Sequence, residues 1–132
     1  MFVRKKIDYY PITIIVLIFA IDLLVFFLSP SWILTLFWGF TSIYIKGFTC
    51  SLNHHHQHYK FFSEKWANRI IEFVMGLQTG VVGELWVLHH TLGHHKNYLD
   101  QTKDESGWQK ENGETMNVLE YTFHVGNTTY AR

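Results

Sequence analysis

Two apolar runs near the amino terminus constrain the fold of this 132-residue chain more than any other feature. They cover residues 11–29 and 32–48, with a proline-containing turn where they meet. Each run is close to the lower limit of about 17–25 residues that a helix needs to span a bilayer. The flanks supply aromatic residues typical of a membrane interface, namely Tyr9, Tyr10 and Trp32. The pattern predicts a transmembrane helical hairpin in an all-α integral membrane protein.

Two other interpretations of the apolar runs are less consistent with the sequence. A signal peptide would end at a small-residue cleavage site, but no such site follows the first run, and a second apolar run comes at once. Two buried helices of a soluble core are the other alternative. The aromatic content of 17% is heavy for a soluble domain of this length, which favours the membrane hairpin.

Basic residues lie at both ends of the predicted hairpin and are missing from its turn. They are Arg4, Lys5 and Lys6 before the first run, and Lys46, Lys60, Lys65 and Arg69 after the second. Under the positive-inside rule, the amino terminus and everything after the hairpin are therefore expected in the cytoplasm.

Net charge and cysteine content exclude several classes of function. The formal net charge is zero, so there is no basic surface of the kind that binds nucleic-acid phosphates. The single cysteine, Cys50, rules out an intrachain disulfide, cysteine-based zinc fingers and iron–sulfur clusters, which need several thiolates.

Histidines gather in two clusters beyond the hairpin, at residues 54–58 and 89–95, which hold eight of the nine in the chain. Neutral imidazole is the commonest protein ligand of transition metals. An expression tag would lie at a terminus, whereas both clusters are internal. The clusters predict a metal site at the cytoplasmic surface of a membrane.

Spacing within the clusters indicates which histidines share a helix face. His54 and His58 are four residues apart, as are His90 and His94, and such residues lie on one face of an α-helix. His95 is turned about 100° further around the axis. Five imidazoles are therefore expected to face a metal from two helices.

Between the clusters, residues 64–78 have the amphipathic pattern of a helix lying in the membrane interface. The expected apolar face contains Ile70, Ile71, Phe73, Val74 and Leu77, and the expected polar face contains Asn68, Arg69 and Glu72.

Three aspartates have expected roles around these elements. Asp22 lies within the first apolar run, so it is expected to point into the helix bundle and to accept hydrogen bonds from Thr35, Thr41 or Ser42. Asp100 and Asp104 follow the second cluster in a polar stretch that predicts a cytosolic loop. Either can accept the outer N–H of a ligating histidine, although a solvated turn with capping aspartates is the alternative.

The ordered clusters resemble the first two histidine boxes of the membrane fatty acid desaturase and hydroxylase superfamily. His54 and His58 in the run Asn53-His54-His55-His56-Gln57-His58 match a first box H-x-x-x-H. The run His90-Thr91-Leu92-Gly93-His94-His95 matches a second box H-x-x-x-H-H. Gln78-Thr79-Gly80 and residues 97–104 are similar to bacterial acyl-lipid desaturases, whose first box His56 also fits, whereas His55 and His89 are supernumerary.

The resemblance implies a di-iron, O2-dependent oxidoreductase that removes hydrogen from an unactivated C–H bond of a lipid acyl chain. Desaturation is expected more than hydroxylation, with electrons from a redox partner such as a ferredoxin or rubredoxin. The resemblance also implies the iron ligands, which are His54, His56, His58, His90, His94 and His95.

A third box, H-x-x-H-H, is expected downstream in this superfamily, and no such run occurs before Arg132. Residues 1–132 are therefore expected to form one partial desaturase-like domain, an amino-terminal fragment with its histidine-box region at 53–110. The rival hypothesis is a non-catalytic membrane accessory protein that holds zinc, copper or nickel and needs no third box. The order of the boxes favours the enzyme.

Overall fold

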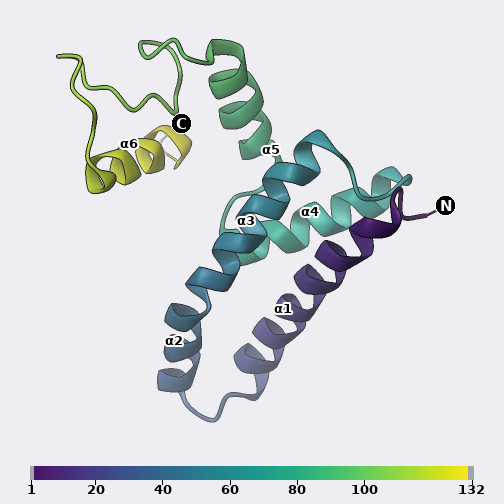
Figure 1. Ribbon diagram of the computed structural model, residues 1–132. Coiled ribbons are helices and arrows are strands. Elements are labelled where there is room, and N and C mark those ends of the chain that lie inside the picture. Colours follow the sequence, from purple (N-terminus) through teal and green to yellow (C-terminus); the bar gives the residue numbers. More distant parts are fainter. Residues whose placement is uncertain (1, 131–132) are drawn as a thin grey trace. The chain divides into compact units, whose positions relative to one another are not determined.

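The computed structural model describes residues 2–130, which are largely helical (Figure 1). The chain forms two compact units, Met1–Gly83 and Glu84–Arg132. The first contains the short 3-10 helix η1 (Lys6–Asp8) and the helices α1 (Tyr9–Leu28), α2 (Trp32–Thr41), α3 (Ile43–His58) and α4 (Lys65–Thr79). The junction and the second unit contain α5 (Gly83–Trp86), the π-helix η2 (Val87–His94), the 3-10 helix η3 (His95–Asn97) and α6 (Val118–Tyr130).

Helix α1 continues from η1, and Lys6–Leu28 is long and apolar enough to cross a membrane. Only 11% of its most apolar window is buried, so most of its apolar surface is exposed. A helix that is apolar all round and exposed suits a lipid environment rather than water. Within the described residues, α1 is the one unbroken helix that meets these requirements.

The second apolar run differs from the expected single helix over residues 32–48. It forms α2 and the start of α3, which bend by 52° at Ser42 and which together are long and apolar enough for a broken span. The hydroxyl of Thr41 donates to the carbonyl of Phe37 at 2.8 Å, and that of Ser42 donates to Gly39 at 3.2 Å. Such hydroxyl-to-carbonyl bonds bend helices, which accounts for the break.

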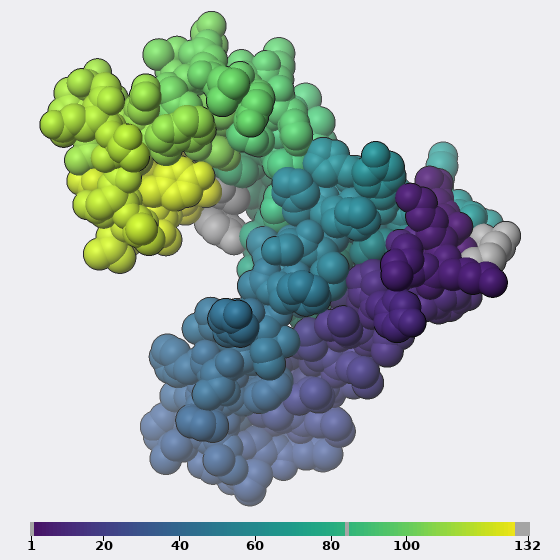
Figure 2. All heavy atoms as spheres, in the orientation of Figure 1, coloured from purple at the N-terminus to yellow at the C-terminus, as the bar shows by residue number. Residues whose placement is uncertain are grey.

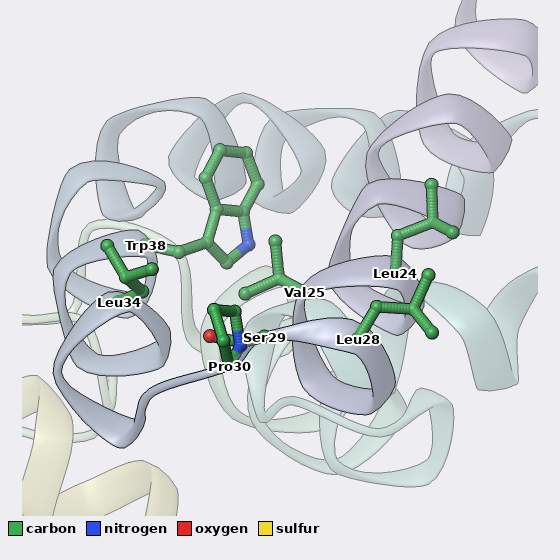
Figure 3. Close-up of a pocket in the computed structure, with 7 residues that line it drawn as sticks. All are labelled: Leu24, Val25, Leu28, Ser29, Pro30, Leu34 and Trp38. Atoms are coloured by element: carbon green, nitrogen blue, oxygen red, sulfur yellow. The ribbon is translucent and has the colours of Figure 1, made fainter.

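Helices α1 and α2 form a hairpin whose turn fixes the start of α2. The Ser31 hydroxyl accepts the N–H of Ile33 at 3.2 Å and so caps that helix. Near the turn an open apolar groove of about 380 Å³ separates Leu24 and Leu28 of α1 from Leu34 and Trp38 of α2 (Figure 3). In the space-filling view, atoms of α1 lie beside those of α2 (Figure 2).

Asp22 points into this helix pair, but its partners differ from those expected. Its Oδ1 accepts the indole N–H of Trp38 at 2.8 Å and lies 2.9 Å from the Lys46 ammonium nitrogen. The hydroxyls of Thr35, Thr41 and Ser42 instead bond to backbone carbonyls of their own helical segment. The prediction of hydroxyl donors was wrong because these short side chains satisfy themselves locally, whereas Trp38 and Lys46 can reach across.

Helix α4 packs against α1 and α3, with polar residues turned inward. Asn68 and Glu72, which were expected on an exposed face, are buried beside Ile71 and Met75. Asn68 accepts the N–H of Phe62 at 3.0 Å and donates to its carbonyl at 2.9 Å, so its burial is compensated. The outward stripe is apolar and consists of Trp66, Ile70, Phe73 and Leu77.

The segment between α3 and α4 is tied to the amino terminus. Val3 forms an antiparallel bridge with Phe62, and the Arg4 N–H donates to the Phe61 carbonyl at 2.8 Å. Phe61 is fully buried in the small core of this unit. These contacts fix the chain just after the first histidine cluster.

The second unit contains a helix, α6, that was not predicted from the sequence. Asn117 accepts the N–H groups of Leu119 and Glu120, both at 3.0 Å, while the Glu120 carboxylate accepts the Asn117 N–H at 2.9 Å. This reciprocal arrangement is a capping box, and its sequence signal is an asparagine followed three residues later by a glutamate. Tyr121 and Thr128 of α6 donate to the carbonyls of Ser106 and Glu105 at 3.4 and 3.2 Å, and so hold that loop.

Replacing Asp22 with Leu should destabilise the first unit more than replacing both Asp22 with Leu and Lys46 with Met. The single change leaves a lysine charge among apolar helices without its partner, whereas the double change removes both charges. Thermal unfolding in detergent micelles measures the ranking. A double variant less stable than the single variant would contradict it.

Candidate metal centre

The first histidine cluster lies on the last turns of α3. His54 and His58 are both exposed, their ring centroids are 5.1 Å apart, and they offer nitrogen atoms within 4.8 Å of each other. The expected pairing of residues four apart is therefore confirmed for this helix. His55 is also exposed and lies beside Tyr59, with ring centroids 5.7 Å apart.

His56 projects from the opposite face of α3 into the interior and is fully buried. Its Nδ1 accepts the N–H of Phe61 at 3.3 Å, and its Nε2 lies 3.4 Å from Oε1 of Glu72. Both ring nitrogens therefore face protein groups. The assignment of His56 as a metal ligand stays a prediction, and ligation through Nε2 requires the ring to turn away from Glu72.

Glu72 lies at the centre of a cluster of charged side chains next to the first histidine cluster. Sequence reasoning missed this role. Its carboxylate lies 2.6 Å from the Lys60 ammonium and 3.2 Å from the Arg69 guanidinium, in addition to the His56 contact. Burial alone would raise the pKa of Glu72, but the His56 and Lys60 contacts outweigh it and lower the pKa to about 2. The ionised carboxylate therefore links α4 to the end of α3.

His89, His90 and His94 of the second cluster lie on the π-helix η2 rather than on the expected α-helix, and His95 begins η3 directly after it. Hydrogen bonds in a π-helix run over five residues, so its turn is wider by one residue. His90 and His95, five apart, have ring centroids 4.4 Å apart, whereas His90 and His94 are 5.7 Å apart. The expected pairing of His90 with His94 is present, but His95, which was expected about 100° further around the axis, lies closer still to His90, because that expectation assumed α-helical geometry.

His90 and His95 bring two ring nitrogens together. Their Nε2 atoms are 3.0 Å apart, within hydrogen-bond distance of each other. Two imidazole nitrogens about 2.1 Å from one ion and at a right angle would be about 3 Å apart. The separation therefore also matches two adjacent positions of an octahedral ion, and imidazole nitrogen is a donor that transition metals prefer.

Two carboxylates of the following loop contact the other histidines of this cluster. Asp104 contacts Nδ1 of His94 with both oxygens, at 2.9 and 3.0 Å. Glu105 contacts Nδ1 of His89 at 3.1 Å. The expected contact from Asp104 is confirmed, while Asp100 instead pairs with Thr102 and Lys103 at 2.6 and 3.1 Å.

Gly93 and Glu105 are further residues that the sequence did not single out. A Cβ on Gly93 would collide with the Glu105 carboxyl group, so glycine is what lets this carboxylate approach His89. The available signal was the adjacent pair of acids at positions 104 and 105, about ten residues after the box.

Replacing Glu72 with Ala should lower the free energy of unfolding by about 3 kcal/mol, because Lys60 and His56 then lose the carboxylate that compensates their burial. Glu64→Ala, at an exposed position before the same helix, should cost less than about 1 kcal/mol. Chemical unfolding in detergent micelles measures both. Equal losses would show that Glu72 is not the link.

Comparison with known proteins identifies the family of the chain. The model of one family, described as fatty acid desaturase, matches residues 30–131, which include both histidine clusters and the loop carboxylates. No curated protein and no solved structure matches the chain. Because the matched residues cover most of the sequence, the chain belongs to the fatty acid desaturase family.

Proposed function

We propose that this chain carries iron-binding histidine boxes of a membrane oxidoreductase that desaturates lipid acyl chains. The observation that carries the proposal is the 3.0 Å approach of the His90 and His95 nitrogens within residues that match the desaturase family. Two imidazole nitrogens at this separation can bind one metal ion together. The family description supports desaturation over hydroxylation and an acyl substrate.

The proposed ligands are the six histidines expected from the sequence. They are His54, His56 and His58 in the first box and His90, His94 and His95 in the second. Two iron ions held by such ligands would supply activation of O2, using two electrons from a ferredoxin or rubredoxin, for removal of hydrogen from an unactivated C–H bond. The chain's own part is to orient these nitrogens.

The fold supports a place for these residues at the cytoplasmic face of a membrane. Helix α1, with the bent pair α2 and α3, has the length and apolar surface for a hairpin through the bilayer. The outward stripe of α4, from Trp66 to Leu77, is suited to the interface between lipid and water. The basic residues around the hairpin support a cytoplasmic position for the histidines.

Alanine replacements of His54, His58, His90, His94 and His95 should each abolish acyl-chain desaturation and lower bound iron in the full-length protein, because each removes a proposed ligand. His55→Ala and His89→Ala, at the supernumerary positions, should leave most of both. Iron content of the purified protein and gas chromatography of the membrane lipids are the two measurements.

His56→Ala separates the two possible roles of His56. Loss of iron with an unchanged unfolding temperature supports ligation, whereas loss of stability with retained iron makes His56 a structural residue. Equal loss of iron at the ligand and supernumerary positions would refute the ligand assignment. Retained zinc or copper without any oxidised acyl product would instead support a metal-binding accessory protein.

A further inference from the structure

We propose that Asp104 is a positioning residue that holds His94 in the tautomer with a proton on Nδ1, so that Nε2 is presented to the metal. The inference rests on the proposed function, in which His94 is a ligand. It adds a residue outside the histidine boxes to the machinery of the site, and it specifies the ligating atom.

The Asp104 carboxylate is buried within the second unit, where it contacts His94. Its side chain has no exposed surface, and besides His94 it accepts the backbone N–H of Ser106 at 2.8 Å. Both carboxylate oxygens lie within hydrogen-bond distance of His94 Nδ1, and carboxylate oxygens accept hydrogen bonds, so the proposal gives this nitrogen the proton. A neutral imidazole with a proton on Nδ1 has its lone pair on Nε2, where a metal can bind.

The loop that carries Asp104 is fixed at several points, so the carboxylate cannot easily follow a moving ring. The Asp104 N–H donates to the Asp100 carbonyl at 2.8 Å, and the Gly107 N–H donates to the Asp104 carbonyl at the same distance. Thr128 of α6 holds the next residue along through the Glu105 carbonyl. These contacts are expected to hold His94 in the same orientation with or without a bound metal.

The neighbouring pair, Glu105 with His89, offers a matched control. Glu105 contacts Nδ1 of His89 much as Asp104 contacts His94. The Nε2 of His89, however, lies 3.4 Å from the Ser106 hydroxyl and so already faces a protein group. Two adjacent acids therefore fix two histidines, but only the ring held by Asp104 belongs to a proposed ligand.

The test compares Asp104→Asn and Asp104→Ala with Glu105→Gln in the full chain, purified in detergent micelles. Titration with Co²⁺, followed by its visible absorption, measures metal affinity without any turnover. Both Asp104 variants should weaken Co²⁺ binding by about 10–100-fold. Glu105→Gln should change it by less than about threefold, and Asp104→Glu should recover part of the loss.

Histidine ¹⁵N NMR of the metal-free chain reads the tautomer directly, with His94→Gln identifying the His94 signals. The wild type should show His94 protonated on Nδ1, and Asp104→Asn should show a mixture of tautomers. Wild-type Co²⁺ affinity in the Asp104 variants, or equal losses in Glu105→Gln, would overturn the proposal. So would a His94 proton on Nε2 in the wild type.

The NMR result also separates this inference from the proposed function. If Co²⁺ does not bind the wild-type chain while the Asp104-dependent tautomer is observed, the assignment of ligands fails and the positioning contact is upheld. If Co²⁺ binds through the other histidines while His94→Gln has wild-type affinity, the role of Asp104 at the metal is overturned and the proposed metal site stands.

Discussion

A carboxylate held against one nitrogen of an imidazole decides what the other nitrogen can do. Among the described residues, this constraint is seen where Glu72 faces His56, where Asp104 faces His94 and where Glu105 faces His89. Each acid comes from a different segment than its histidine, so each contact also joins two parts of a unit. The orientation of the histidines and the packing of the segments around them therefore depend on the same few interactions.

Helix α4 shows how such an interaction can reverse an amphipathic pattern. Sequence periodicity assigned Asn68 and Glu72 to a solvated face, whereas both are buried and Phe73 is exposed. Burial of polar residues is stable when every group has a partner, and Asn68 and Glu72 have theirs on the segment that follows the first box. The apolar stripe left outside is then consistent with contact with lipid, so the helix still suits an interface.

Much of the fold was predictable because apolar runs and helix periodicity are local properties. Helices α1 and α4 lie within two residues of the expected ranges at each end, and the His54–His58 pair has the expected spacing. The bend at Ser42, the π-helix and the partners of Asp22 were not predictable in this way. They depend on which hydroxyl, ring or charge finds a partner elsewhere, and spacing alone carries no such information. Helix α6 lies between these cases. Its capping box can be recognised in the sequence, but no helix was predicted from it.

The π-helix at the second box has a consequence for how the length of a box can vary. Residues five apart converge on η2, so a box with three residues between its first and second histidines brings its outermost pair together within one wide turn. A run with one residue fewer would bring its outermost histidines together in an ordinary α-helical turn, because residues four apart share one face of an α-helix. The width of the turn can therefore compensate for a difference of one residue in the length of a box.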